Sequence, residues 1–136
     1  MNKTVSIKVK VDTIYIAQTL VYKIKDDAYE LLASSPKVFD GNIDLDQFGN
    51  LIFRKIGDTD SLKGWTLLVV TFLNHLPDDI KTGEDLKTFV LDPNNATSLD
   101  YWVKKDDDIM NFQLTEDDTF SMKINNEGRI LKKLLI

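Results

Sequence analysis

Four aliphatic residues near the N-terminus alternate with polar ones, and this alternation is the strongest constraint on the fold. The apolar positions are Val5, Ile7, Val9 and Val11. Successive side chains of a strand point to opposite faces, so this spacing predicts a strand with one buried face. Such a strand needs partner strands beside it and a second layer over its apolar face.

The size and composition of the chain fit a single domain that spans residues 1–136. Apolar residues make up 43% of the chain, which is enough for one core. The chain has no cysteine, and this excludes disulfides, zinc–thiolate sites and thiol catalysis. Lys8, Lys10 and Asp12 interrupt the apolar residues near the N-terminus, unlike in a signal peptide. We therefore expect a cytoplasmic protein with no membrane segment.

Two helices are expected in the first part of the chain. Residues 26–34 begin with acids and precede Pro36, which predicts a short helix. A long helix is predicted from Asp60 or Ser61 to the residue before Pro77. Its apolar positions, three or four residues apart, are Leu62, Trp65, Val69, Phe72 and Leu76. The Val-Val-Thr segment at its centre forms helices poorly, so burial would have to stabilise it.

The other segments are expected to be strands. Residues 12–25 fit a strand or a helix, and their β-branched and tyrosine residues favour a strand. A hairpin is predicted around Gly49-Asn50, with Ile43 and Leu45 before the turn and Leu51 and Phe53 after it. Further strands are expected at residues 88–91, 99–103, 110–114, 120–124 and 129–136. The predicted fold is α+β, an antiparallel meandering sheet packed against one long and one short helix.

No group of residues matches a catalytic motif. His75 is the only histidine, and a place in the last turn of the long helix favours a structural role through the helix dipole. Ser34 and Ser35 lack the glycine-flanked elbow of a serine hydrolase, and the glycines form no phosphate-binding loop. We therefore expect a non-enzymatic protein without a cofactor.

Three acidic groups contain the residue types of a cation site. They are Asp44 with Asp46, Asp58 with Asp60, and the triplet Asp106, Asp107 and Asp108. A calcium loop requires ligands at regular positions, a glycine and a distal glutamate, and none of these groups has that pattern. They are typical of solvated turns, and no metal is expected.

The acidic charge is concentrated late in the chain. The net charge is −5, and residues 106–118 hold six acids and no base. Nucleic-acid binding requires a cationic surface, so this balance argues against it and fits a basic protein partner, although solubility alone also explains it. The acids predicted to bind such a partner are Asp106, Asp107, Asp108, Glu116, Asp117 and Asp118.

Trp102 completes this predicted binding site. If Tyr101 and Val103 face the core, Trp102 faces outward beside Lys104 and the acidic turn. An exposed tryptophan is typical of a protein interface. The equally weighted alternative is a tryptophan that another layer or lysine side chains cover. The two acidic groups lie at opposite ends of one predicted strand, so one end together with Trp102 is the more economical site.

The middle of the chain resembles small bacterial α+β proteins of uncharacterised or toxin-immunity type. The resemblance covers residues 26–76 and rests on DAYELL, then VFDGNIDLD followed by GNLIF, then GWTLLVVTFLNHL. It implies a non-enzymatic cytoplasmic protein that neutralises a basic toxin domain by binding it, and it carries over no site residues. Two other functions remain open: a small-ligand or enzymatic domain with a dispersed site, and a homo-oligomer paired through an exposed sheet edge.

Overall fold

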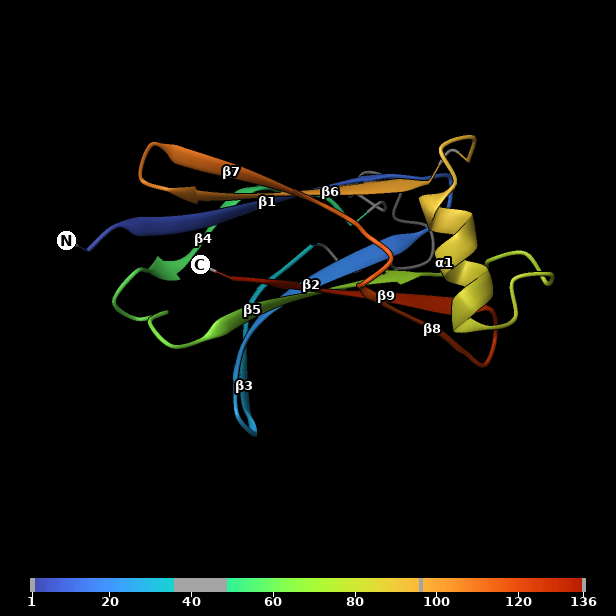
Figure 1. Ribbon diagram of the computed structural model, residues 1–136, viewed down its shortest axis with the longest axis horizontal. Coiled ribbons are helices and arrows are strands. Elements are labelled where there is room, and N and C mark those ends of the chain that lie inside the picture. The colour runs from blue at the N-terminus through green and yellow to red at the C-terminus, as the bar shows by residue number, and fades with distance from the viewer. Residues whose placement is uncertain (1, 36–48, 96, 136) are drawn as a thin grey trace, which may run out of the picture.

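The protein is an antiparallel β-sandwich, in which two sheets pack face to face (Figure 1). The computed structural model describes residues 2–35, 49–95 and 97–135. Strands account for 57% of the described residues and helix for 8%. The predicted α+β class, with one long and one short helix, is therefore wrong.

The first sheet has four strands in the order β4-β1-β6-β7. They are β1 (Thr4–Asp12), β4 (Leu51–Asp58), β6 (Ser98–Lys105) and β7 (Asp108–Gln113). β1 pairs with β6 in an unbroken antiparallel register. On its other side β1 pairs with β4, and two register shifts interrupt that ladder.

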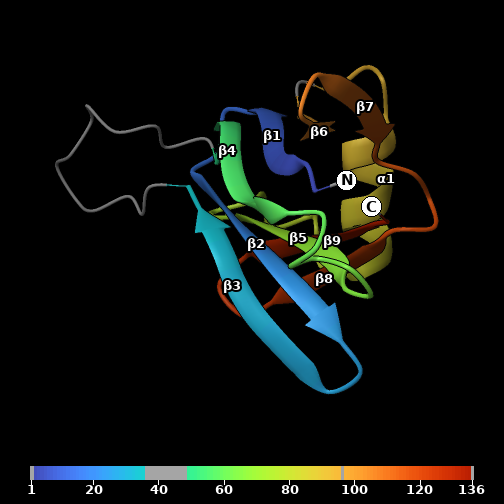
Figure 2. The same ribbon diagram turned by 90° about the vertical axis from the view of Figure 1, so that its left-hand side faces the viewer.

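The second sheet has five strands in the order β3-β2-β5-β9-β8. They are β2 (Ala17–Lys25), β3 (Ala28–Ser34), β5 (Thr66–Leu73), β8 (Thr119–Lys123) and β9 (Glu127–Leu134). β3 forms one edge of this sheet, and the tip of the β2–β3 hairpin extends away from the other strands (Figure 2).

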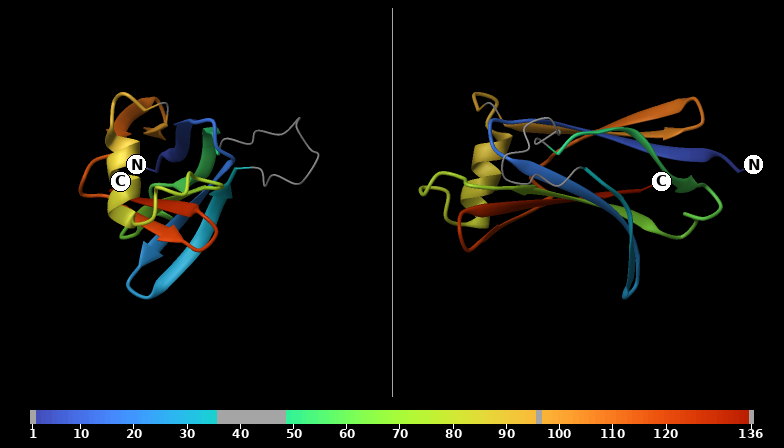
Figure 3. Two further views of the ribbon diagram at one scale, coloured as in Figure 1. Left: turned by 90° about the vertical axis from the view of Figure 1, so that its right-hand side faces the viewer. Right: turned by 180° about the vertical axis from the view of Figure 1, so that it is seen from behind.

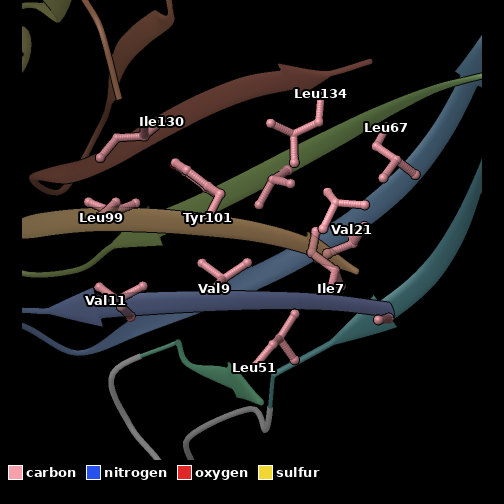
Figure 4. Close-up of a cluster of buried hydrophobic side chains, with 14 of the residues drawn as sticks. Ile7, Val9, Val11, Val21, Leu51, Leu67, Leu99, Tyr101, Ile130 and Leu134 are labelled. Carbon is pink, nitrogen blue, oxygen red and sulfur yellow. The ribbon is translucent and has the colours of Figure 1, made fainter. Parts of the chain in front are cut away.

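Alternate residues of both sheets fill the core between them (Figure 4). The four alternating residues of β1 are each at most 2% exposed, so the predicted half-buried strand is confirmed. The inward residues of β6 are Leu99, Tyr101 and Val103, as predicted. The second sheet contributes Val21, Leu67, Val69, Ile130 and Leu134.

One helix, α1 (Gly83–Leu91), stands across one end of the sandwich (Figure 3). The Thr82 hydroxyl accepts a hydrogen bond from the Asp85 backbone N–H at 3.1 Å, and the Asp85 carboxylate accepts one from the Thr82 N–H at 3.2 Å. This capping box satisfies backbone donors that the first helical turn leaves unpaired. Leu86 and Val90 are buried, so α1 closes the core at this end.

The Thr82→Ala variant is expected to lower the free energy of unfolding by about 1 kcal/mol, because it removes the hydroxyl that caps α1. Urea unfolding measures the change.

Backbone hydrogen bonds from Lys81 and then Thr82 hold the pKa of Asp85 below its ordinary value of 3.8. A carboxylate with a lowered folded-state pKa stabilises the fold above the ordinary pKa, and this contribution is lost as the pH falls through the folded-state value. Urea unfolding should therefore show a smaller effect of Asp85→Asn well below pH 3.8 than at neutral pH. An Asp85→Asn effect that is equal at both pH values would contradict this assignment.

The segment predicted as a long helix is β5 with its flanking turns. Leu67 and Val69 face the core, while Leu68 and Val70 lie on the opposite side of the strand. Because both faces of the strand carry apolar residues, it also contains apolar residues three or four positions apart, and this spacing resembles that of a helix. His75 follows β5 in an exposed position at φ 59°, so its predicted place in a helical turn is also wrong.

The short helix predicted at residues 26–34 is wrong as well, because residues 28–34 form β3 and pair with β2. The strand favoured for residues 12–25 is confirmed for residues 17–25, which form β2. The strand predicted at residues 88–91 is the second half of α1. The T-x-x-D spacing of the capping box was the available signal for this helix.

The C-terminal strands lie close to their predicted positions, but they do not form one meander. β6 pairs with β7 in the first sheet, whereas β8 pairs with β9 in the second. The chain therefore changes sheets between Gln113 and Thr119. In the predicted hairpin, Leu51 and Phe53 belong to β4, while Ile43 and Leu45 lie outside the described residues.

Candidate functional site

The acidic turn between β6 and β7 holds part of the N-terminus in place. The Thr4 backbone N–H donates a hydrogen bond to Asp106 Oδ1 at 2.9 Å. Lys3 Nζ lies 3.5 Å from Asp108 Oδ2, and Asp107 is exposed in the same turn. Two of these three carboxylates therefore have contacts within the fold.

The second acidic group lies beyond the other end of β7, where the chain crosses between sheets. Lys132 Nζ donates to the two carboxylate oxygens of Asp118 at 3.2 and 3.0 Å. Both side chains are only 10% exposed. Asp118 also accepts a hydrogen bond from the Thr115 backbone N–H at 2.8 Å. Asp118 is thus turned inward, whereas Glu116 and Asp117 are exposed.

Trp102 lies on the outer face of the first sheet, among lysines rather than among the acids. Its half-buried ring lies opposite Lys8 in the β1–β6 register. Lys8 Nζ is 4.8 Å from the centre of this ring, a cation–π contact. Of the two environments that the sequence left open, the structure shows the tryptophan covered by a lysine.

A second aromatic ring lies beside Trp102 on this face. Lys8 Nζ is 5.8 Å and Lys104 Nζ is 5.6 Å from the centre of the Phe53 ring. We call this surface the basic–aromatic face and define it by Lys8, Phe53, Lys55, Trp102 and Lys104. The sequence alone did not bring these residues together, because they come from three strands far apart in the chain.

The outer face of the second sheet is apolar over β2, β3 and β5, whereas β8 and most of β9 carry polar residues there. We define this apolar outer face by the outward residues Leu20, Tyr22, Ile24, Tyr29, Leu31, Leu68, Val70, Phe72 and Leu131. In the strand register, Leu20 pairs with Val70 and Val70 with Leu131, so one apolar row crosses three strands. None of the nine belongs to the core cluster, although Val70 is only 7% exposed. Its neighbours in the register, Leu20 and Leu131, are apolar and lie on the same face.

The β2–β3 hairpin carries the most exposed part of this face. The rings of Tyr22 and Tyr29 meet edge to face at 6.1 Å between centres. Tyr29 is 75% and Leu31 is 51% exposed. Among the described residues, β3 has no further partner strand, so its outer edge offers free backbone donors and acceptors.

An enzyme centre usually contains an accessible ionisable group with a shifted pKa or a cluster of metal ligands. Burial raises the pKa of the Tyr101 hydroxyl, and the negative charges of Asp118 and Asp100 raise it further. Tyr101 is fully enclosed between the sheets, however, and no substrate can reach it there. Across the described residues, no three His, Cys, Asp or Glu side chains are grouped as metal ligands. Asp44 and Asp46 lie outside those residues. No helix in the described part of the chain has the length and apolarity to cross a bilayer.

The described residues form an antiparallel β-sandwich with one sheet of four strands and one of five, and each sheet has one outer face. Comparison with protein-family models, with curated proteins and with solved structures gives no match. The resemblance to toxin-immunity proteins therefore stays a prediction.

Proposed function

We propose that the protein is a non-enzymatic binding module that takes a protein partner on the apolar outer face. The observation that carries this proposal is the continuous apolar row of Leu20, Val70 and Leu131, which lies outside the core. Antiparallel sheets that face water on one side usually carry polar residues there. A contiguous apolar patch on an outer face is typical of a protein interaction site.

The open edge of β3 suggests how the partner binds. An extended segment of the partner can pair with β3 and continue the sheet, with main-chain hydrogen bonds supplying affinity. Its alternate side chains would then lie beside Tyr29 and Leu31, which are exposed on the same face. Tyrosine is enriched among the residues that dominate binding energy, so Tyr29 is the expected anchor.

A different protein fits this edge better than a second copy of the chain. One antiparallel self-pairing, centred on Glu30, would place the two Glu30 carboxylates directly opposite each other, each with its own Lys23 Nζ at 3.3 Å. Like charges in such cross-strand positions are destabilising. In our proposal the partner therefore supplies an uncharged or basic residue at this position, such as a lysine opposite Glu30.

The basic toxin partner and the acidic binding residues predicted from the sequence are compatible with this proposal. A basic toxin domain is one such partner, and the exposed Asp107, Glu116 and Asp117 would increase its association rate. Asp117 also lines a depression of about 240 Å³ next to Leu68 and Leu131 of the apolar outer face. A cytoplasmic location, in which such neutralisation would take place, remains a prediction.

The Leu31→Glu variant is expected to weaken partner capture by at least about tenfold, because it places a charge in the apolar interface. Ile109→Glu is the matched control, since Ile109 is 54% exposed but lies in the first sheet, whereas Leu31 is 51% exposed. The measurement is photo-crosslinking in the native host from a probe at Tyr29, followed by identification of the partner and titration of the purified pair.

Three results would count against the proposal. Equal loss of binding in Leu31→Glu and Ile109→Glu would mean that the apolar outer face is not the site. Crosslinks only between copies of this chain, with a dimer in light scattering that Leu31→Glu dissociates, would replace the partner with a second copy. Specific turnover of a small molecule by the purified protein would favour the enzymatic alternative.

A further inference from the structure

The basic–aromatic face contains two lysines that share one aromatic ring. Lys8 Nζ and Lys104 Nζ lie 5.8 and 5.6 Å from the centre of Phe53. Lys8 is also held over Trp102 at 4.8 Å. The rings thus attract two ammonium groups to one region, although like charges repel each other.

Within the described residues, neither of these ammonium groups forms an ion pair. In the stretches that the structure describes, the ion pairs of lysine involve Lys3, Lys10, Lys23 and Lys132. Lys8 and Lys104 are therefore cations with aromatic neighbours and without a carboxylate partner among the residues that the structure describes. Lys55 is exposed on the edge strand β4 and lies opposite Ser6 of β1, so it adds a third positive charge to this face.

A backbone irregularity places Phe53 in this position. The register of β4 against β1 shifts between Ile7 and Val9, which identifies a β-bulge. At this bulge Phe53 has φ 30°, a left-handed conformation that is uncommon for a bulky side chain. Bulges redirect side chains, and strained backbone concentrates at functional sites. The observation is independent of the lysines and points to the same surface.

We infer that the basic–aromatic face binds an acidic peptide segment, whose carboxylates pair with Lys8 and Lys104. Side-chain carboxylates are the complementary groups for two ammonium donors without partners. The aromatic rings hold the lysines in place and provide apolar surface for the peptide. This site lies on the other sheet from the apolar outer face, so it does not depend on the function proposed above.

A peptide fits this surface better than a nucleic acid. Single-stranded nucleic acids stack their bases on open aromatic faces, whereas ammonium groups already lie over Phe53 and Trp102. The net charge of −5 also repels a long polyanion more strongly than a short acidic segment.

The test is a titration with a short glutamate-rich peptide, followed by the fluorescence of Trp102. The protein carries Trp65→Phe, because Trp65 is its other tryptophan. We expect a saturable change in emission that weakens as salt is added. The double variant Lys8→Gln and Lys104→Gln should weaken binding by about tenfold or more, because it removes both charge-assisted contacts.

The control is the double variant Lys123→Gln and Lys133→Gln, which removes the same charge from exposed positions of the second sheet. It should bind the peptide almost as well as the parent protein. Circular dichroism must show that every variant is folded, and Phe53→Leu should weaken binding while leaving the lysine charges in place. The inference is overturned if no binding occurs at millimolar peptide, or if both double variants lose affinity equally. Tighter binding of oligothymidylate than of the peptide would overturn it in favour of a nucleic acid.

Discussion

The Asp118→Ala variant is expected to lower the free energy of unfolding by about 3–5 kcal/mol. The change leaves the Lys132 ammonium without its partner at a position where the side chain is only 10% exposed. Desolvation of an unpaired charge is the main cost, and the hydrogen bond from the Thr115 N–H to the carboxylate is lost as well. Urea unfolding, monitored by circular dichroism, measures the change.

Two further variants separate the ion pair from the general effect of removing an acid. Asp117→Ala removes the exposed neighbouring carboxylate and should change the free energy of unfolding by less than about 0.5 kcal/mol. Adding Lys132→Met to Asp118→Ala should restore much of the lost stability, because the buried charge is then absent. A cost below about 1 kcal/mol for Asp118→Ala would show that Lys132 reaches solvent easily.

The sequence could not distinguish Asp118 from the two acids before it. All three are consecutive in a loop-like segment, and the partner of Asp118 is 14 residues away on β9. Which acid turns inward depends on the pairing of β8 with β9, and that pairing is a tertiary property. Local charge patterns therefore overestimate the number of acids that are available to a partner.

Strands with one polar face could be predicted from the sequence, as β1 and β6 show. In both, apolar and polar residues alternate because one face meets the core and the other meets water. Trp102 was correctly expected on the outer face for this reason. The sequence left cover by lysine side chains open but could not identify Lys8 or Phe53, because these reach Trp102 only through the pairing of β1 with β6 and β4.

The wrong long helix and the missed apolar outer face have one physical cause. Residues 67–73 are almost all apolar, since β5 contacts the core on one side and the apolar outer face on the other. The period-two signal disappears when both faces are apolar. The Val-Val-Thr segment at the centre of β5 was the remaining evidence for a strand, because β-branched residues favour strands. If this segment had been assigned as a strand, the sequence alone would have predicted the second apolar face.

Adjacent residues of β5 provide the most direct test of this arrangement. The Leu67→Glu variant is expected to lose more than about 4 kcal/mol or to fail to fold, because Leu67 is fully buried and a carboxylate there has no partner. Leu68→Glu should cost less than about 1.5 kcal/mol, since Leu68 is half-buried on the outer face and lies opposite Lys133. Thermal and urea unfolding of the two purified variants measures the difference.

The Leu67→Glu and Leu68→Glu variants also distinguish an effect on stability from an effect on partner binding. If the apolar outer face is the docking surface, Leu68→Glu folds normally and loses its partner, whereas Leu67→Glu fails because the core is disrupted. In a helix over the same segment, the side chains of residues 67 and 68 would point about 100° apart, so they would not lie on opposite faces as they do in a strand. Similar costs for both variants would contradict the strand. A folded Leu68→Glu protein with unchanged partner affinity would support the sandwich fold but contradict the apolar outer face as the binding site.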